Sequence, residues 1–435
     1  MKSTFLLQLH CPFCGGPFAI SHGEESGGEV RLGLLTCGCG VYPLVAGIPV
    51  LRKDAVAQKA VELVRSGRDS DALFTLLAPA PPALAHRWVR SLPSLPVLRW
   101  IKNAAHRQAL DEFAAKLAPD LTAVEVLHLY FRNTRENYNY LSYRFGQPRH
   151  LVALSFASLI PPGRPVLDVG CGCGHITHSL AQRARGELVV GIDEFFFGLY
   201  LGKHWIAPAA EYVCCAADAK LPFADGTFSA AFSSDSFHYF THKDVSLGEM
   251  ARVTGPEGLI LLAGMHNAQV QRLMAYGLPL PPAGYEALAG KTPHRLVADR
   301  DVLARYFEKL GPPLAAPAGR ARLDTAPLLS LALSHRPEVF ADHGTFADWP
   351  HAQGRLGVNL LYREEGPDSA GNFRLQRTFP SALYEADHAE IKAYIPESVE
   401  VSPATLAELS RGERTPGVER LLAQCVVLGM PERYH

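Results

Sequence analysis

Two periodicities alternate along the middle of the chain and predict a layered α/β domain. Between residues 151 and 264, short apolar runs rich in β-branched residues are separated by longer stretches whose apolar positions recur every three or four residues. The short runs predict buried strands, and the longer spacing predicts helices that cover them. Regular alternation of strand and helix is typical of a doubly wound parallel sheet. The expected strands are Pro165–Gly170, Glu187–Asp193, Tyr212–Asp218, Ser229–Ser234 and Leu259–Ala263.

The pattern after residue 264 predicts how this sheet is completed. Residues 266–295 are rich in Pro and Gly, and a helix is expected at Asp301–Leu310. Two further apolar runs, Leu328–Leu333 and Leu356–Tyr362, are expected to close the sheet as an antiparallel pair. The sheet would then have seven strands.

Two helix-start signals mark the end of the chain. Ser402 and Thr415 each precede a proline at the first position of a predicted helix. A capping side chain followed by proline favours the start of a helix, because proline needs no hydrogen-bond acceptor there. We therefore expect a small helical appendage over residues 366–435.

Residues 53–150 are expected to form a helical cap or linker region. Apolar positions recur at helical spacing in Ala57–Val64, Val97–Ile101 and Ala109–Leu117. Between residues 86 and 102, basic and aromatic side chains interleave, which is typical of a surface that contacts RNA or a membrane. The same pattern is typical of an amphipathic helix whose basic side chains cover apolar neighbours, and we favour that interpretation.

Four cysteines in the first 52 residues have the spacing of metal ligands. They form a C-x-x-C pair and a C-x-C pair, Cys11 with Cys14 and Cys37 with Cys39. Four thiolates can enclose one tetrahedral Zn²⁺, and in so small a module the metal supplies folding free energy that a core cannot. Because the second pair is shorter, either its knuckle is distorted or His10 or His22 replaces one thiolate. A module that has lost its metal is a further alternative.

One stretch joins the first predicted strand to a helix through three glycines. Asp168 ends an apolar run, Gly170, Gly172 and Gly174 follow at every second position, and a helix is expected from His175. Such a turn lets a ligand lie against bare backbone at a helix N-terminus. The last glycine of the dinucleotide-binding fingerprint would fall at His175, so the spacing differs from that motif. A purely structural turn is the alternative.

This stretch resembles the first motif of class I S-adenosylmethionine-dependent methyltransferases, in which the acid and the glycines hold the methionine end of the cofactor. The resemblance extends over residues 165–264 and implies that Asp193 binds the ribose and Asp218 the adenine amino group. The segment after Asp218 is one residue shorter than the family's pattern. The implied cofactor-binding residues are Tyr143, Arg144, Asp168, Gly170, Gly172, Gly174, Asp193, Asp218, Ala219 and Ser234.

The flanking regions carry further resemblances. The cysteine module resembles the zinc-ribbon domain that is fused to, or partners, many methyltransferases, including its ending at Val41–Leu51. In the family, the segment before the first strand often covers the cofactor, which is why Tyr143 and Arg144 are candidates. Segments after strands four and five overhang the methyl group, so residues 266–295 are a predicted substrate lid.

Methyl transfer needs alignment of the acceptor, and it needs a base when the acceptor is a hydroxyl or an ammonium group. His238 is our first choice of base, because an unperturbed pKa of about 6.5 suits proton transfer at neutral pH. Asp235 is expected to orient the His238 ring, and Tyr239 and His266 are further catalytic candidates. The alternative for each is a hydrogen-bonded loop residue.

Composition and charge narrow the functions. The chain has 435 residues, 48% of them hydrophobic, and a net charge of −1, which gives no global attraction to nucleic acid or anionic lipid. Nine unevenly placed cysteines argue against a disulfide framework. Neither a signal peptide nor an apolar run long enough to span a membrane is predicted, so we expect a cytoplasmic protein.

We therefore expect a zinc-ribbon module at 1–52, a cap at 53–150, a Rossmann-like methyltransferase domain at 151–365 and the appendage at 366–435. The predicted function is S-adenosylmethionine-dependent methylation of a small or medium-sized metabolite at oxygen or nitrogen. A methyltransferase acting on RNA or protein is one alternative, and a non-catalytic cofactor-binding scaffold is another. Zn²⁺ is the expected structural metal, and the sequence allows a homodimer.

Overall fold

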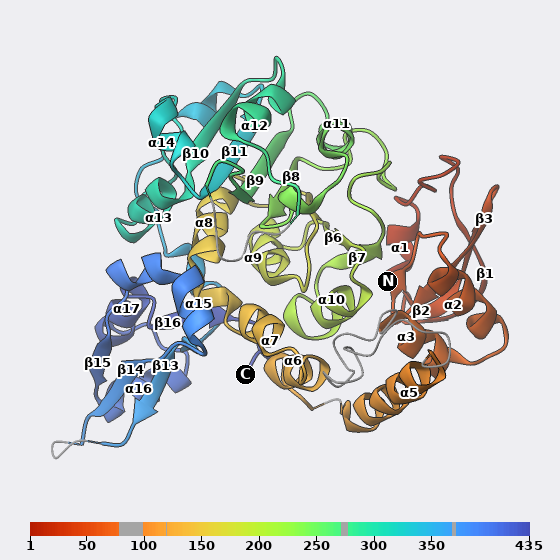
Figure 1. Cartoon of the computed structure of the whole chain (residues 1–435), viewed down its shortest axis with the longest axis horizontal. Coiled ribbons are helices and arrows are strands. Elements are labelled where there is room, and N and C mark those ends of the chain that lie inside the picture. Colours follow the sequence, from red (N-terminus) through yellow and green to blue (C-terminus); the bar gives the residue numbers. More distant parts are fainter. Residues whose placement is uncertain (78–98, 119, 271–276, 368–370) are drawn as a thin grey trace.

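A sheet of seven strands forms the centre of the fold, in the order β10-β11-β9-β8-β5-β6-β7 (Figure 1). The structure, a computed structural model, describes residues 1–77, 99–118, 120–270, 277–367 and 371–435. Strands β5 to β9 pair in parallel, whereas β11 runs antiparallel between β9 and β10. The expected doubly wound α/β sheet is confirmed. The strands are β5 (Val166–Val169), β6 (Val189–Asp193), β7 (Glu211–Cys214), β8 (Ala230–Ser234), β9 (Leu259–His266), β10 (His294–Ala298) and β11 (Leu328–Ser334).

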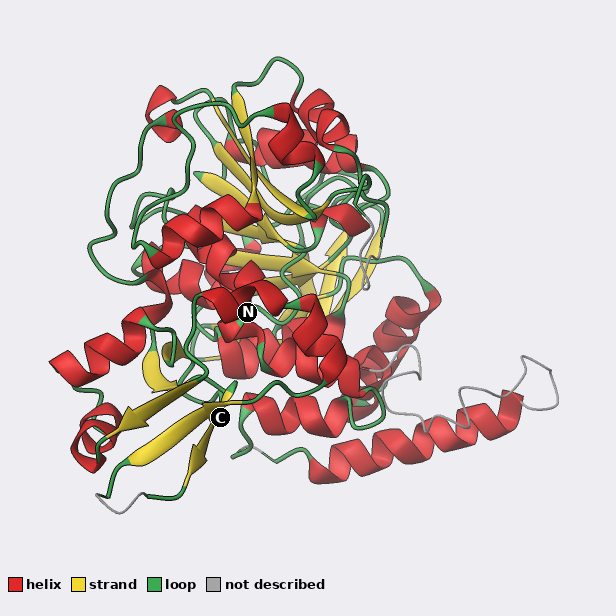
Figure 2. Ribbon diagram, turned by 60° about the vertical axis from the view of Figure 1, so that its left-hand side comes forward, coloured by secondary structure: helices red, strands yellow, loops and turns green. Residues whose placement is uncertain are grey.

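Helices cover both faces of this sheet (Figure 2). All four residues of β5 and all eight of β9 are buried. Strands that are buried on both faces have continuous apolar runs rather than alternating ones, which is why the sequence pattern predicted them. The helices of this region are α9 (His175–Ala184), α10 (Phe196–Leu201), η3 (Gly202–Ile206), η4 (Phe237–Tyr239), α11 (Lys243–Thr254), α12 (Pro282–Ala289), α13 (Asp299–Phe307) and α14 (Arg320–Asp324).

One strand of the sheet differs from the prediction. Residues Leu356–Tyr362 were expected to pair with β11, but β10 occupies that position. Arg355–Val358 instead form β12, which pairs with β16 (Val427–Met430) outside the central sheet. The prediction for Leu356–Tyr362 is therefore wrong. Both segments are short runs with apolar residues, and long-range packing rather than periodicity decides which partner such a run finds.

The N-terminal module is an antiparallel sheet that docks on the edge of the central sheet. Its elements are α1 (Ser3–Leu6), β1 (Ala19–Ser26), β2 (Glu29–Cys37), β3 (Gly40–Val45) and β4 (Ile48–Pro49). Just after β4, Val50 forms a parallel bridge with Cys214 of β7, and the Leu51 amide donates to the Cys214 carbonyl at 2.8 Å. Because β7 is an edge strand, this contact pairs backbone groups that an open edge would leave exposed.

The region between this module and β5 is helical, as expected. Asp54 caps α2 by accepting from the amides of Val56 and Ala57, and Thr122 and Glu125 form a capping box on α6. The basic and aromatic segment between residues 86 and 102 lies largely outside the described residues. The helices are α2 (Ala55–Arg65), α3 (Asp69–Leu77), α5 (Arg99–Lys116), α6 (Ala123–Tyr130), α7 (Arg135–Ser142), η2 (Arg144–Gly146) and α8 (Pro148–Ala157).

The C-terminal region combines short helices with small sheets. Both predicted capped helices are present, with Ser402 and Thr415 accepting from the amides of Thr405 and Val418. A three-stranded sheet, β13-β14-β15, accompanies them and was not predicted. The elements are η5 (Pro337–Phe340), η6 (Pro350–Ala352), β13 (Tyr362–Glu365), β14 (Phe373–Arg377), α15 (Ala382–Asp387), η7 (Ala389–Ala393), β15 (Ser398–Val401), α16 (Pro403–Ser410) and α17 (Pro416–Ala423). Among all described helices, none has the length and apolar character needed to cross a membrane.

Candidate active site

The turn after β5 adopts backbone conformations that favour glycine. Gly170 and Gly172 have φ angles of +71° and +55°. A Cβ atom on Gly170 would lie 2.6 Å from the Ser236 hydroxyl oxygen, so this position has no room for a side chain. On Gly172, by contrast, a Cβ atom would meet nothing within 4 Å. The turn therefore presents bare backbone to open space, next to the start of α9 at His175.

Two carboxylates flank this turn in different surroundings. Asp168 is fully buried, and its Oδ2 accepts the Thr177 hydroxyl at 2.5 Å, while its Oδ1 has no hydrogen-bond partner among the described residues. Burial raises the pKa of Asp168 to about 7, against the effect of the Thr177 hydrogen bond. Asp193, at the end of β6, accepts from the amides of Gly172 and Phe195, each at 2.8 Å.

A cavity of about 240 Å³ opens above the turn and brings several predicted residues together. The predicted residues that line it are Arg144, Gly170, Gly172, Asp193, Ser234, Asp235 and Tyr239. Others lining it were not predicted, among them Tyr140, Leu141, His150, His175, Ile176 and Ser236. Tyr140 and Leu141 belong to the aromatic segment that precedes Tyr143, so the density of aromatic residues there was the available signal.

Several predicted residues lie away from this cavity, namely Tyr143, Asp168, Gly174, Asp218, Ala219, His238 and His266. Asp218 Oδ2 accepts from the amides of Thr241 and His242 at 2.8 and 3.2 Å, so this carboxylate holds the loop that precedes α11. Strand β7 ends at Cys214, four residues before Asp218. The role of Asp218 toward adenine stays a prediction.

Asp235 is the most strongly paired carboxylate of the site. Its side chain is only 4% exposed, and its φ of +55° lies in the left-handed region. Oδ2 accepts from Tyr140 Oη at 2.6 Å and from Arg144 Nη1 at 2.9 Å, and Arg149 Nη1 lies 3.5 Å away. Burial alone would raise the pKa of this carboxyl, but Arg149 and Arg144 hold it well below its usual range. Asp235 is therefore ionised at neutral pH and poorly suited to accept a proton.

Two buried histidines follow β8 and end β9. The rings of His238 and His266 stack with centroids 3.9 Å apart and 13° between their planes. His266 Nε2 lies 3.9 Å from Asp235 Oδ1. Neither ring nitrogen of His238 has a hydrogen-bond partner among the described residues. Burial lowers the pKa of His238 to about 3, although the charge of Asp235 opposes this. His238 is therefore a neutral imidazole at pH 7.

The ligand atoms of Asp235, His238 and His266 lie within 4.8 Å of one another, a spacing that metal sites also show. The lone pair of an imidazole nitrogen lies in the plane of its ring, so a shared ion must lie close to both ring planes. Rings stacked almost parallel, 3.9 Å apart, do not allow this. Two guanidinium groups beside Asp235 would also repel a cation. We therefore propose no metal centre at these residues.

The four cysteines of the N-terminal module converge, as their spacing predicted. Their sulfur atoms lie within 4.8 Å of one another, with Cys11–Cys39, Cys14–Cys37 and Cys37–Cys39 distances of 3.5, 3.7 and 3.6 Å. A tetrahedron with metal–sulfur bonds of about 2.3 Å has edges of about 3.8 Å. The observed distances fit this geometry. The C-x-C pair thus supplies two sulfur atoms to one cluster, and neither histidine alternative is needed.

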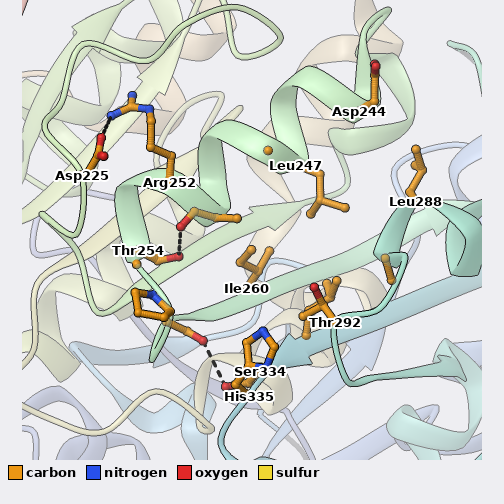
Figure 3. Close-up of a pocket in the computed structure, with 17 residues that line it drawn as sticks. Asp225, Asp244, Leu247, Arg252, Thr254, Ile260, Leu288, Thr292, Ser334 and His335 are labelled. Atoms are coloured by element: carbon orange, nitrogen blue, oxygen red, sulfur yellow. Dashed lines mark hydrogen bonds and ion pairs between the residues drawn. The ribbon is translucent and has the colours of Figure 1, made fainter.

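A larger cavity of about 550 Å³ lies at the opposite end of the sheet (Figure 3). It is bordered by the Asp225–Arg252 ion pair and by apolar side chains such as Leu247, Ile260 and Leu288. The Ser334 hydroxyl donates to the Gly258 carbonyl at 3.0 Å. Among the described residues that line it, no buried side-chain atom lacks a hydrogen-bond partner. The polar groups that carry chemistry gather at the glycine turn instead.

The domain that contains the glycine turn is similar to known methyltransferases. Residues 167–262 match the family described as "Methyltransferase domain". The chain is 28% identical over 207 residues to the ubiquinone/menaquinone biosynthesis C-methyltransferase UbiE of Burkholderia cenocepacia, covering 42% of this chain and 82% of that one. It is 27% identical over 137 residues to the malonyl-[acyl-carrier protein] O-methyltransferase of Methylovorus sp., covering 29% and 45%. The YcgJ protein of Bacillus subtilis superposes on 43% of the chain, and on 99% of its own length, with 15% identity and a TM-score of 0.32.

The residues at the turn fit S-adenosylmethionine. The cofactor carries an α-ammonium group, and Asp168 Oδ1 is an acceptor without a partner among the described residues. Asp168 is fully buried and does not line the cavity, so its contact with the ammonium group stays a prediction. The open side of Gly172 leaves room for a ligand against the backbone. Asp193 ends the neighbouring strand and lines the cavity, where a carboxylate can accept from ribose hydroxyls. Together with the matches to methyltransferases, these features make the domain an S-adenosylmethionine-dependent methyltransferase of class I.

The raised pKa of Asp168 predicts that cofactor affinity depends on pH. Below about pH 7 this carboxyl is protonated, so it must lose a proton before it can pair with a cationic ammonium group. We expect the affinity for S-adenosylhomocysteine to fall on the order of tenfold between pH 7.5 and pH 5.5, as linkage requires. Calorimetry at both pH values measures this. Asp193, whose pKa is also raised, would give the same trend, so the Asp168→Asn variant is the control and should lose most of it.

Proposed function

We propose that this S-adenosylmethionine-dependent methyltransferase acts on a small or medium-sized metabolite, at oxygen or nitrogen. The observation that carries the proposal is the burial of the candidate residues on the acceptor side. Tyr140 and Arg144 of the cap line the cofactor cavity, and Asp235, His238 and His266 are buried. A small acceptor can reach groups buried in this way, whereas a macromolecular substrate needs an open approach.

The proposed mechanism divides the work among residues of this chain. S-adenosylmethionine, when bound, supplies the methyl group and its own leaving group. Asp168, the glycine turn and Asp193 hold the cofactor. Asp235, paired with Arg144 and Arg149, holds the cap at the wall of the cavity. Alignment of acceptor and cofactor supplies most of the rate.

His238 is the proposed base for an acceptor that must lose a proton. Its unpartnered ring nitrogens and its neutral state at pH 7 suit this role. The Leu278 amide donates to the His238 carbonyl at 2.8 Å, and Gly277 packs against the same carbonyl. These two residues belong to the predicted lid. Because these residues contact His238, which is buried, the proposal requires that residues 277–278 move when the acceptor binds.

The two relatives named above are a C-methyltransferase and an O-methyltransferase. Methylation at carbon is therefore a second candidate for this chain. Carbon-13 NMR of a product made with 13C-methyl-labelled S-adenosylmethionine distinguishes the three bond types, because methyl carbons bonded to carbon, nitrogen and oxygen have different chemical shifts.

Zn²⁺ is the proposed metal of the cysteine cluster, where four sulfur ligands leave no open position for catalysis. Its proposed role is to stabilise the N-terminal module on the edge strand β7. The module reaches the methyltransferase domain through Arg52, whose Nη1 donates to the Glu194 carbonyl at 3.0 Å, next to Asp193.

Purified protein should carry about one zinc ion per chain, measured by elemental analysis. The Cys11→Ser variant should lose the metal and melt at a lower temperature, because a buried ligand of the cluster is removed. Protein grown with ample zinc that contained none would contradict the proposal. Cys425→Ser, at a buried cysteine remote from the cluster, is the matched control and should keep its metal.

The His238→Gln variant should bind S-adenosylhomocysteine normally and lose methyl transfer by roughly 10²–10⁴-fold, the usual contribution of a general base. The wild-type rate should stay level down to about pH 5, because the base form persists above its lowered pKa of about 3. Single-turnover kinetics with the identified acceptor measure both. His335→Gln, an exposed histidine at the opposite end of the sheet, should change neither. Near-normal turnover in His238→Gln would leave alignment as the source of the rate.

An RNA or protein acceptor is tested by following the methyl label. Labelled S-adenosylmethionine should transfer to a low-molecular-mass fraction of a cell extract and not to its RNA or protein. We expect no RNA affinity at physiological ionic strength, since the net charge of −1 offers few phosphate contacts. Micromolar, salt-sensitive RNA binding that is lost when Arg87, Arg90, Arg99 and Lys102 become Ala would favour the RNA alternative. A protein that binds the cofactor and labels no fraction would favour the scaffold.

A further inference from the structure

Four charged side chains form one buried row beside the cofactor cavity. Arg144 Nη1 lies 2.9 Å from Asp235 Oδ2, Arg149 Nη1 lies 3.5 Å from the same oxygen, and Arg149 Nη2 lies 2.6 Å from Asp387 Oδ2. None of the four side chains is more than 9% exposed. Arg144 and Asp235 line the cavity itself. Asp387 is the member of this row that comes from the C-terminal region, at the end of α15.

Asp387 balances the charge of this row. Two guanidinium groups and two carboxylates cancel, whereas the row without Asp387 carries one excess positive charge in a buried place. Water cannot screen such a charge well, so it acts on any ligand in the adjoining cavity. Other charges near the row are Lys243, whose Nζ donates to the His238 and Phe240 carbonyls, and Glu390, which acts on Arg149. Lys243 and Glu390 carry opposite charges, so together they add no net charge near the row.

The C-terminal region holds the same part of the cap at two further points. Tyr384 Oη, from α15, lies 3.5 Å from the Tyr143 carbonyl. Tyr434 Oη donates to the Ser142 carbonyl at 2.9 Å and lies 3.3 Å from His175 Nε2. Residues far along the chain therefore hold the segment that carries Arg144 and Arg149. The ion pair between Asp387 and Arg149 is one part of this larger contact.

We propose that Asp387 is a positioning residue that keeps the wall of the cofactor cavity electrically neutral and thereby favours S-adenosylmethionine over S-adenosylhomocysteine. This inference rests on the proposed use of S-adenosylmethionine. The two molecules differ at sulfur, where the substrate is a positively charged sulfonium and the product a neutral thioether. An uncompensated arginine in the wall repels the first and leaves the second almost unaffected.

The comparison of both ligands separates charge from structure. In Asp387→Asn the amide oxygen can still accept from Arg149, so the shape of the contact is kept while its charge is lost. One unit charge acting through a few side chains, at an effective dielectric constant of about 20, changes affinity on the order of tenfold. Calorimetry on the full chain should show S-adenosylmethionine weakened by about this factor and S-adenosylhomocysteine by less than about threefold.

A charge-balanced double variant provides the decisive control. Arg149→Gln combined with Asp387→Asn removes one charge of each sign, so it should restore the wild-type ratio of the two affinities even if it melts at a lower temperature. Glu385→Gln changes a carboxylate on the same helix that pairs with Lys392 on the surface, and its ratio should equal that of the wild type. Thermal melts verify that each variant is folded.

Each outcome decides the inference. Equal weakening of both ligands in Asp387→Asn, or a double variant that keeps an altered ratio, would show a structural role alone and overturn it. If Asp387→Asn does not fold, Arg149→Gln alone replaces it as the unbalanced variant, because its excess negative charge should shift the ratio of affinities toward S-adenosylmethionine. A wild-type protein that binds neither ligand would instead refute the proposed cofactor.

Discussion

A buried negative charge on Asp235 sets the strongest constraint on the structure. A carboxylate that is only 4% exposed must be compensated by charges or hydrogen bonds, since its desolvation costs several kcal/mol. The compensation comes from Tyr140 and Arg144 in the cap and from Arg149 at the start of α8, and Asp387 in turn balances Arg149. Three parts of the chain therefore have to meet at the carboxyl end of β8, and the cofactor cavity lies where they meet.

Two carboxyl groups of the site, Asp168 and Asp235, have different pKa values because their surroundings differ. Asp168 and Asp235 are both buried, yet burial raises the pKa of the first to about 7 while two arginines keep the pKa of the second well below its usual range. Asp168 can therefore exchange a proton when a cationic group binds, whereas Asp235 provides a permanent charge. His238 is also neutral at pH 7, because burial lowers its pKa. These surroundings are the reason that His238, and not Asp235, is the residue proposed as the base.

Sequence patterns predicted the features that depend on residues close together in the chain, namely the glycine turn and the buried parallel strands. The spacing of Gly170, Gly172 and Gly174 follows from positive φ angles and close contacts within one turn, and buried parallel strands appear as apolar runs. The completing strand was mispredicted because β10 and Leu356–Tyr362 have similar patterns and different long-range partners. The pairing of Arg149 with Asp387 joins residues 238 positions apart, and a single sequence contains no periodicity that reports such a contact. Likewise, the arginines beside Asp235, and neither residue type nor burial, distinguish its pKa from that of Asp168.

The N-terminal module and the C-terminal region make different kinds of contact with the methyltransferase domain. An α/β sheet with open edges exposes backbone donors and acceptors on its last strand, and the N-terminal module meets this need by continuing past β4 alongside β7. The C-terminal region instead supplies a carboxylate to a buried arginine and hydroxyl groups to backbone carbonyls of the cap. Two ion pairs, Asp387–Arg149 and Arg149–Asp235, connect the C-terminal region to a residue of the cavity wall. The N-terminal module contacts the edge strand β7 and, through Arg52, the Glu194 carbonyl next to Asp193. Side-chain charges of the C-terminal region therefore lie closer to the cavity wall than the cysteine cluster does in this chain of contacts.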